Sequence, residues 1–486
     1  MLKKTQKAVI GTLEWLEDRT GLWAMFGPVL THLAPRDAKW WYVYGSATLM
    51  AFMIQVATGV ALMFSYIPSG GQAYDSLKYI ADVAPWGHLI RGMHYFGASA
   101  MILLIGIHMG QVFFHGSYKF PREMNWVTGI ALLAFTIGLG FTGQTLRWDS
   151  NAVWSIVVAA EQAARVPFIG HWLAHFILAG DNINGATLGR FFTLHVFVLP
   201  ALAIAGIGLH MVLVMRHGIA EMPDEAHPVI PETYREEYHA RLEKTGVPFW
   251  LMAWRDSVFS LVVVLAVVFA AIYFNPPPVE LPPDPSIIET DPIPDFYLRW
   301  YLAVLALAQS DMEDYIILGA PALIGILLFA IPFLSSSGHR APSKRPWAIV
   351  SLLTAMLVVG AFWIEAEKGN WTPNFHPKPL TPELIGATEG PIWHGAQLFQ
   401  EKGCINCHSL ANNGGHRGPD LTYVGDRLHK DNLTIRINMG GVNMPAYAGS
   451  LTGDDLRDLI SFLETRKKKQ PALEGEAAKE EPAKKS

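Results

Sequence analysis

The chain has 486 residues, of which 51% are hydrophobic and only 16% charged, and its formal net charge is −5. This charge says little about partners, and we expect no nucleic-acid partner. Length alone decides nothing, since a soluble chain of this size could also bury a large core.

The first predicted element is a surface helix. The sequence begins with MLKKTQKAVIGTLEWLEDRTGLW, which is amphipathic and charged. It lacks the uninterrupted apolar segment of a cleavable signal peptide. We therefore expect a helix that lies on the membrane surface, in contact with membrane lipid.

Seven long stretches of the chain contain no Lys, Arg, Asp or Glu. They are residues 40–74, 92–118, 124–146, 191–215, 257–279, 315–339 and 346–364. A helix that crosses a bilayer needs about 20 such residues. Buried helices of a soluble protein rarely give seven runs of this length, so we predict an all-α membrane protein with seven transmembrane helices.

The distribution of Lys and Arg predicts how these helices are oriented. If the N-terminus is inside, the inner segments carry 16 Lys and Arg, and the outer segments up to the last span carry six. The positive-inside rule then makes the N-terminus cytoplasmic. Seven crossings place everything after about residue 365 on the outer side of the membrane.

Two of the apolar runs contain paired histidines. His94 and His108 are 14 residues apart, and His195 and His210 are 15 apart. At 3.6 residues per turn each pair falls roughly on one helix face, with a rise of about 21–22 Å. A lone histidine in a membrane helix is more often a packed residue. Four with matched spacing predict two stacked, non-covalent haem b groups, each iron taking one His from each helix.

Paired glycines follow the same period. Gly45 and Gly59 are 14 apart on the first span, and Gly129 and Gly143 are 14 apart on the third. A missing side chain lets a flat macrocycle approach the backbone closely. One period on four helices is what two haems at a fixed separation in a four-helix bundle require.

Other polar residues lie near the span ends. Arg91, one turn before His94, is either a partner for a haem propionate or an interfacial arginine. We expect His88, His115 and His217 to be ordinary interfacial residues.

Both cysteines of the chain lie in the segment Cys404-Ile405-Asn406-Cys407-His408. This is the C-x-x-C-H pattern of covalent haem attachment, in which both cysteines form thioethers and the histidine binds the iron. A dithiol pair or half of a zinc site is the alternative, but no second cysteine pair follows. We therefore predict one haem c, on the side of the membrane where such attachment normally occurs.

The residues between these motifs carry a family resemblance. The marks are QVATG (55–59), IRGMHYFGAS (90–99), RFFTLHVFVLP (190–200) and PDFY (294–297). Over about residues 30–365 the chain resembles cytochrome b of the cytochrome bc complexes, the quinol:cytochrome c oxidoreductases. The 14/15 histidine spacing, and three spans after the four-helix bundle, resemble the split, chloroplast-type and Gram-positive-type members.

The C-terminal part resembles a class I cytochrome c. Its marks are GPDLTYVGDR (418–427), NMPAYAG (443–449) and the helical segment LTGDDLRDLISFLETR, in which Thr452 and Asp455 form an approximate capping box. The resemblance implies five parts. They are a dihaem four-helix domain (1–220), a C-terminal cytochrome b domain with three spans (221–366), a linker (367–390), a cytochrome c domain (391–466) and a disordered tail (467–486).

The resemblance also assigns haem ligands. His94 and His195 would hold the low-potential haem near the outer face, and His108 and His210 the high-potential haem near the inner face. In the cytochrome c domain His408 would be the proximal ligand. Met444 is the favoured distal ligand and Met439 the competing one, and core packing is the structural alternative for either.

The resemblance places an outer quinol site at PDFY, where the family usually has Pro-Glu-Trp-Tyr. Asp295 would take a proton from the quinol and Tyr297 would hydrogen-bond to it. The shorter carboxylate resembles members that use low-potential quinols such as menaquinol. The alternative is that Asp295 merely caps the helix that follows it.

Three further positions depart from the family or stay open. Arg147 in RWDSNAVW replaces a family proline, which could reshape the outer site. Arg255 and Asp256 match a pair near the inner quinone-reduction site, or simply flank the fifth span. Val43 stands where chloroplast-type proteins have the cysteine that attaches an extra haem, so a covalent extra haem is excluded.

The implied function is quinol oxidation at the outer face. One electron would pass to a Rieske iron–sulfur protein and on to the haem c. The other would cross the two b haems to an inner quinone, which moves protons outward. The Rieske protein must be a separate subunit, since no free cysteine remains here for an iron–sulfur centre. The resemblance further implies a homodimeric complex and a soluble or membrane cytochrome c, or another acceptor, as electron partner.

Two other functions stay open at this point. The first alternative is a quinone-reducing cytochrome that receives electrons from its own c domain. The second is a non-catalytic electron-relay subunit, whose quinol pocket would be inactive because of the departures at Arg147 and Asp295.

Overall fold

The structure is a computed structural model that describes residues 2–180, 183–283, 294–308, 312–368, 377–415, 418–440, 444 and 446–468. The predicted linker lies partly, and the predicted disordered tail almost entirely, outside these residues. The described chain forms two compact units, one with α1 to α15 and the other with α16 to α20.

The part of the chain that the structure describes contains seven helical segments long and apolar enough to cross a membrane, which confirms the predicted all-α membrane fold. They are α3 (Tyr44–Met63), α5 (Gly87–Phe114), α6 (Glu123–Thr145), the continuous segment Gly185–His217, α12 (Ala253–Tyr273), the segment Tyr315–Leu334 and α15 (Pro346–Lys368). A helix satisfies all its backbone hydrogen bonds internally, which lipid requires.

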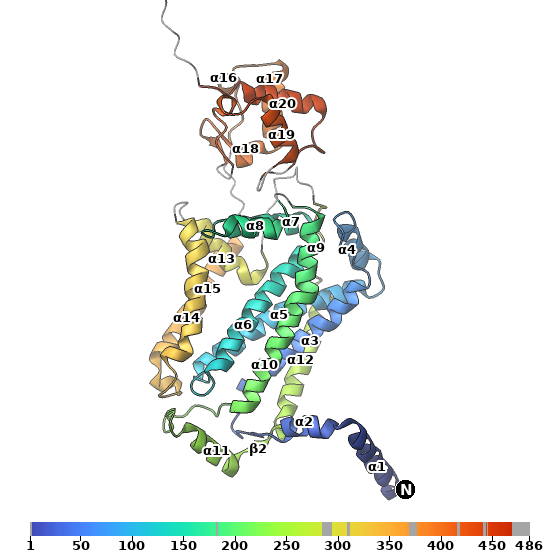
Figure 1. Cartoon of the computed structure of the whole chain (residues 1–486), viewed down its shortest axis with the longest axis vertical. Helices are drawn as coiled ribbons and strands as arrows, with labels where there is room; N and C mark the ends of the chain where they lie inside the picture. The colour runs from blue at the N-terminus through green and yellow to red at the C-terminus, as the bar shows by residue number, and fades with distance from the viewer. Residues whose placement is uncertain are drawn as a thin grey trace, which may run out of the picture. The chain divides into compact units, whose positions relative to one another are not determined.

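Helices α3, α5, α6 and α10 form the central bundle, and α12 packs against α3 and α5 (Figure 1). Small residues on α3, among them Ala47 and Ala51, are fully buried and let the neighbouring helices approach. Leucine, methionine and valine side chains of α5 and α12 fill the rest of this core. Helix α13 (Phe296–Leu307) packs on α15, and α14 (Ala320–Leu334) contacts α6.

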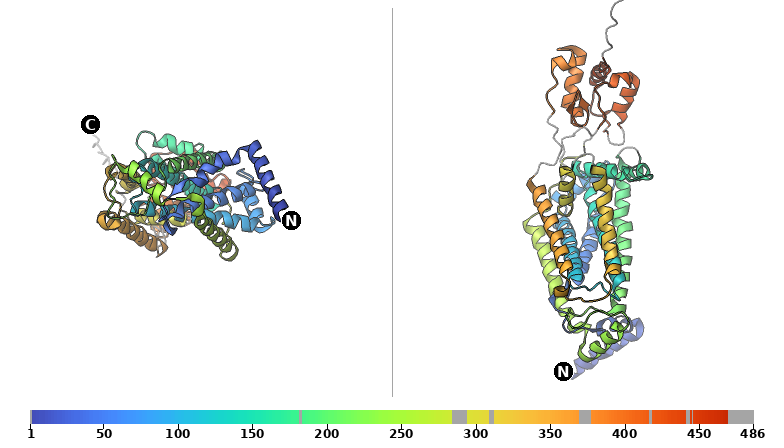
Figure 2. Two further views of the ribbon diagram at one scale, coloured as in Figure 1. Left: turned by 90° about the horizontal axis from the view of Figure 1, so that it is seen from below. Right: turned by 90° about the vertical axis from the view of Figure 1, so that its left-hand side faces the viewer.

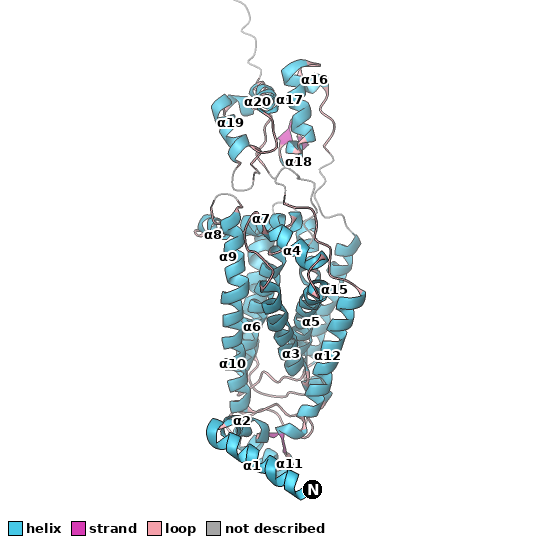
Figure 3. Ribbon diagram, turned by 90° about the vertical axis from the view of Figure 1, so that its right-hand side faces the viewer, coloured by secondary structure: helices cyan, strands magenta, loops and turns pink. Residues whose placement is uncertain are grey.

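Shorter elements close both ends of this bundle. Helices α7 (Ser150–Ala164) and α8 (Gly170–Leu178) lie across one end, near α4 (Ala73–Asp82) (Figure 3). Helices α1 (Leu2–Thr20), α2 (Leu22–Thr31) and α11 (Tyr234–Thr245) lie at the other end (Figures 1 and 2). Strand β1 (Leu33–Ala34) pairs there with β2 (Val247–Pro248) in antiparallel register. Single 3₁₀ turns occur at Trp40–Tyr42, Phe249–Leu251 and Pro342–Lys344.

The apolar side chains of α1 and α2 are exposed. Ile10, Leu13, Trp15, Leu22 and Trp23 are each 47–60% accessible. An amphipathic helix with such a face partitions into the headgroup region of a bilayer. This supports the predicted surface helix.

The fourth span is not a regular α-helix. Between α9 (Gly185–Thr193) and α10 (Leu199–His217) lies a π-helical turn, Leu194–Val198, in which the amide of Leu199 donates to the carbonyl of Leu194. Pro200 follows directly and lacks the amide that an α-helix would use. A π turn takes up one extra residue. The 15-residue spacing of His195 and His210 therefore matches the 14-residue spacing on α5. A second π turn, Tyr315–Gly319, precedes α14.

The second unit is a small helical domain. It contains α16 (Pro382–Ile385), α17 (Gly390–Glu401), α18 (Cys404–Cys407), α19 (Lys430–Met439) and α20 (Gly453–Glu464), with a 3₁₀ turn at Val424–Asp426. Strands β3 (Ser409–Leu410) and β4 (Asn413–Gly414) form a short antiparallel pair.

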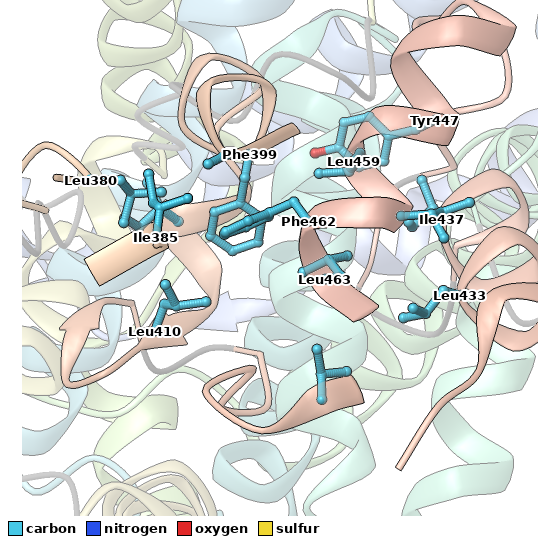
Figure 4. Close-up of a cluster of buried hydrophobic side chains, with 14 residues drawn as sticks. Leu380, Ile385, Phe399, Leu410, Leu433, Ile437, Tyr447, Leu459, Phe462 and Leu463 are labelled. Atoms are coloured by element: carbon cyan, nitrogen blue, oxygen red, sulfur yellow. The ribbon is translucent and has the colours of Figure 1, made fainter. Parts of the chain in front are cut away.

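Helices α17 and α20 cross closely in this unit, because Gly395 lies where a side chain would collide with the Asp458 backbone and come within 2.8 Å of Phe462 Cβ. Phe399 and Phe462 pack beside that crossing in a core of its own (Figure 4). The predicted capping box is confirmed: Asp455 N donates to Thr452 Oγ1 at 3.1 Å, and Thr452 N donates to the Asp455 carboxylate at 3.2 Å.

Candidate functional site

The four membrane histidines form two pairs. His94 of α5 and His195 of the π turn have ring centroids 6.2 Å apart, at an interplanar angle of 79°. Two imidazoles that bind one metal atom between them, each through a nitrogen about 2.0 Å away, have centroids roughly 6 Å apart. We call His94 and His195 the near pair, because they line the cavity described below. His108, which lies against Gly45, and His210, which lies against Gly129, are the far pair.

Each histidine ring lies against one of the four predicted glycines. An ideal Cβ would lie 3.3 Å from His94 Cε1 at Gly59, 3.3 Å from His108 Cε1 at Gly45, 2.7 Å from His195 Cε1 at Gly143, and 3.8 Å from His210 Cε1 at Gly129. The glycines of α3 therefore face the histidines of α5, and those of α6 face the histidines of the fourth span. This cradle fits a flat macrocycle held between the rings of each pair.

Three threonines that sequence reasoning missed contact the same rings. The contacts are Thr58 Oγ1 to His94 Nδ1 at 2.9 Å, Thr142 Oγ1 to His195 Nδ1 at 3.2 Å, and Thr128 Oγ1 to His210 Nδ1 at 2.9 Å. Each threonine directly precedes one of the glycines. The repeated Thr-Gly dipeptide was the available signal.

A cavity of about 430 Å³ connects the near pair to the predicted quinol residues. Its wall is mostly apolar and includes His94 and His195 at one place and Asp295 and Tyr297 at another. A quinol is an apolar ring with two hydroxyl groups, and such a wall with few polar groups suits it. The structure therefore brings Asp295, Tyr297 and the near pair together around one space.

Asp295 does not act as a helix cap. Its backbone carbonyl accepts from Leu298 N at 2.9 Å, but its side chain makes no capping hydrogen bond to α13. Burial raises the pKa of Asp295, while the positive charges of Arg147 and Arg299 lower it. The carboxyl group is thus placed at the cavity wall without a structural task in the helix.

Tyr297 presents a buried hydroxyl to the same cavity. Among the described residues this hydroxyl has no hydrogen-bond partner. Burial, and then the charge of Asp295, raises the pKa of Tyr297, so the phenol keeps its proton. A Cβ at Gly140 of α6 would lie 2.5 Å from the hydroxyl oxygen, so glycine is required there for the ring to fit.

The turn that carries these two residues is tied to its surroundings. Trp300 Nε1 donates to the Tyr297 carbonyl at 2.9 Å, and Trp363 Nε1 of α15 donates to the Phe296 carbonyl at 3.0 Å. Arg299 forms an ion pair with Glu367 of α15. These bonds hold the start of α13 in place beside the cavity.

Arg147, which replaces the family proline, is built into the cavity wall. It forms an ion pair with the fully buried Asp149 and donates to the Pro278 carbonyl at 3.3 Å. Asp149 in turn caps α7, accepting from Ala152 N at 3.0 Å. Arg91 also lines the cavity and donates to the neighbouring carbonyl of Pro277 at 2.5 Å. Both arginines therefore brace the segment that follows α12.

The predicted inner-site residues do not pair with each other. Asp256 accepts a hydrogen bond from Ser46, the residue after Gly45, whereas Arg255 donates to the Ala38 carbonyl at 3.1 Å. Asp256 thus contacts the residue next to Gly45, and Arg255 braces the segment before α3. Val43 beside them is buried.

His88 and His115 have different environments. His88 Nε2 lies 2.9 Å from Asn275 Oδ1 at an exposed position, as expected for an interfacial residue. His115 is only 5% accessible, which differs from that expectation. Its ring stacks on Tyr42, and its Nδ1 lies 2.9 Å from Gln111 Nε2. Aromatic side chains and Gln111 at the end of α5 thus shield its ring from solvent.

In the second unit α18 presents Cys404 and Cys407, and His408 follows it. His408 Nδ1 donates to the Pro419 carbonyl at 2.8 Å, which leaves Nε2 free to bind a metal. Gly418 contributes, since a Cβ there would collide with the His408 ring. Among the described residues no group of three or more His, Cys, Asp or Glu could hold a metal ion.

The two candidate distal methionines differ in burial. Met444 packs partly buried against the core of the second unit, and Met439 is 66% accessible. This difference supports Met444 as the residue that faces the domain interior.

Comparison with known proteins finds matches to two parts of the chain. Residues 29–218 match the family described as "Cytochrome b/b6/petB", and residues 391–463 match "Cytochrome C oxidase, cbb3-type, subunit III". Cytochrome b6 of Prochlorococcus marinus (strain MIT 9303) is 33% identical over 207 residues, which are 43% of this chain and 95% of that protein. Cytochrome b6 of Acaryochloris marina (strain MBIC 11017) is 34% identical over 43% of this chain and 96% of its own length.

A solved structure extends the likeness of fold beyond these matches. A chain of "Hyperthermophilic respiratory Complex III" has a TM-score of 0.63 and 24% identity, covering 76% of this chain and 92% of its own.

Proposed function

Because this chain belongs to the cytochrome b/b6 family and carries a C-terminal cytochrome c domain, we propose that it is the cytochrome b/c subunit of a quinol:cytochrome c oxidoreductase of the cytochrome bc type. It is an electron-transport membrane protein with haem b and haem c as cofactors. The finer assignments below go beyond this family membership.

The haem-binding residues are proposed from the geometry of the pairs. His94 and His195 hold one haem b, His108 and His210 hold a second, and the four glycines make room for both. Cys404 and Cys407 would attach the haem c, and His408 and Met444 would hold its iron. Bound haem supplies one-electron acceptors, and the protein supplies the ligands, the orientation and the apolar surroundings.

The quinol site is the cavity beside the near pair. Asp295 accepts the proton of one quinol hydroxyl, and the Tyr297 phenol donates a hydrogen bond to a quinol oxygen. The observation that carries this proposal is that Asp295 reaches the cavity wall and leaves the helix uncapped. We propose menaquinol as substrate, because the short aspartate is the variant found in members that use low-potential quinols.

Electrons leave this site by two routes. A Rieske protein, a separate subunit, takes one electron and passes it to the c domain and then to a soluble or membrane cytochrome c or another acceptor. The near and far pairs would hold the two b haems, which would supply a route for the other electron to an inner quinone near Asp256, whose carboxylate contacts Ser46 beside Gly45. These electron transfers move protons outward across a bacterial cell membrane. The N-terminus is cytoplasmic and the c domain lies outside. We propose a homodimeric complex.

The test is Asp295→Asn in the assembled complex. We expect menaquinol oxidation to fall by about a hundredfold or more, which is the usual contribution of a general base. A pyridine haemochrome spectrum should still give two haem b and one haem c for each chain. Asp314→Asn is the matched control, since Asp314 is an exposed aspartate paired with Arg165.

Other outcomes would separate the alternatives. Unchanged quinol oxidation in Asp295→Asn would contradict the proposed site and favour a relay subunit. Reduction of the quinone pool by electrons supplied to the c domain, in membranes without any Rieske protein, would favour the quinone-reducing function. One haem b or none would contradict the two-pair assignment.

A further inference from the structure

Thr58, Thr128 and Thr142 can each only accept a hydrogen bond from the histidine that they contact. Thr58 Oγ1 already donates its proton to the Ile54 carbonyl at 2.6 Å. A hydroxyl has one proton and two lone-pair sites, so this oxygen must accept from His94 Nδ1. His94 Nδ1 therefore carries the hydrogen, and Nε2 keeps the lone pair that binds a metal.

The other two threonines follow the same rule. Thr128 donates to the Met124 carbonyl at 3.0 Å, and Thr142 donates to the Gly138 carbonyl at 2.7 Å. Their oxygens are thus left to accept from His210 and His195. In all three cases a carbonyl one turn earlier fixes the direction of the hydroxyl, so the hydroxyl accepts from the imidazole Nδ1–H. The carbonyls of Leu139 and Asn125 also accept from His195 and His210, respectively.

His108 is the exception. The residue before Gly45 is Tyr44, whose ring packs edge-on against Phe259 with centroids 5.7 Å apart. Within the described residues, the buried Nδ1 of His108 has no hydrogen-bond partner. The near pair therefore has two anchored rings, and the far pair has one.

We propose that Thr58, Thr142 and Thr128 are positioning residues for haem, and that their unequal distribution helps to set the two haem b sites at different potentials. A hydrogen bond from Nδ1–H to an oxygen makes Nε2 a more basic ligand and holds the ring. A more basic ligand favours oxidised iron. This effect lowers the potential of the near site relative to the far site. The inference rests on haem binding and is independent of quinol oxidation.

Thr58→Val in the full-length protein removes one anchor while keeping the shape of the side chain. An equilibrium redox titration of the haem b absorbance should show one of two waves moved to higher potential. At a fixed potential the ratio of oxidised to reduced haem in that wave should fall by about three- to tenfold, the usual effect of one hydrogen bond. Thr48→Val is the control, since Thr48 donates to the Tyr44 carbonyl at 2.8 Å in the same helix.

The converse variant adds the missing anchor at the far site. Tyr44→Thr should move the other wave to lower potential. Tyr44→Val introduces a side chain of the same shape as threonine but without a hydroxyl, and it should not move that wave. A shift of the same wave in Thr58→Val and Tyr44→Thr would overturn the proposal, as would equal shifts in Tyr44→Thr and Tyr44→Val. If Thr58→Val loses one haem b, Thr58→Ser must retain it at the original potential; loss in both overturns the proposal.

Discussion

At the scale of single residues, each membrane histidine lies against a glycine of the neighbouring helix, as the spacing of these residues predicts. Spacing along a helix specifies which side chains share a face, and His94 does face Gly59 as Gly143 faces His195. The threonines could not be found in this way. Threonine is common in membrane helices, and the spacing of the histidines does not separate Thr58 from Thr48. The glycine after Thr58 and the contact of its hydroxyl with His94 do.

The glycines differ in how much space they leave, and this gives a prediction. A Cβ at Gly143 would lie 2.7 Å from His195, a distance that forces the ring to move, whereas at Gly129 it would lie 3.8 Å from His210, an ordinary contact. We expect Gly143→Ala to lose one haem b for each chain and Gly129→Ala to retain both. Haem content from pyridine haemochrome spectra checks this, and equal retention by both variants would contradict it.

Arg147 gives a second prediction at this scale, on pH dependence. Its charge lowers the pKa of Asp295, so Arg147→Gln raises that pKa further above its ordinary value. A base works only when deprotonated, so the acid limb of quinol oxidation should move to higher pH. The measurement is the rate of quinol oxidation against pH. Arg147→Lys keeps the charge and should retain most of the original pH profile. An acid limb that does not move in Arg147→Gln would contradict the proposed effect of the Arg147 charge on Asp295.

At the scale of elements, the π turn is what sequence periodicity missed. A regular helix of 15 residues predicts a small angular offset between His195 and His210. The structure removes this offset within Leu194–Val198, next to Pro200. Helical periodicity assumes a constant 3.6 residues per turn, so it cannot predict a local change to a π turn.

The π turn predicts the effect of a deletion. Removal of Val198 together with Pro200→Ala should convert the turn to α-helix and leave both histidines facing their partners, because only the extra residue is lost. Removal of Ile204 from the regular part of α10 should rotate His210 away by about 100° relative to His195. We expect two haem b in the first variant and one or none in the second. Equal haem contents would show that the turn is not the place where the extra residue is absorbed.

At the scale of the whole molecule, the seven spans were predictable because lipid allows so few solutions. A run of about 20 apolar residues in a bilayer has to be helical. The packing of α12 against α3 and α5, and of α13 against α15, was not predictable, because apolar faces of membrane helices carry few distinguishing side chains.

The orientation of the whole chain gives a further prediction. Lys430 of the second unit and Lys244 of α11 are both exposed lysines. With Cys404 and Cys407 bound to haem, Lys430→Cys should react with a membrane-impermeant maleimide in spheroplasts. Lys244→Cys should react only after permeabilisation. Labelling of Lys244→Cys in intact spheroplasts would reverse the proposed topology.

The pairing of β1 with β2, together with the packing of α12 on α3 and α5, has a genetic consequence. The regions before and after residue 220 are in contact through these elements, so we expect them to assemble without the peptide bond between them. A gene divided at this point, with a stop codon and a new start codon, should still yield a paired product from two co-expressed chains. Fusion or division of the reading frame at this point should therefore change the number of genes and leave the helix bundle unchanged.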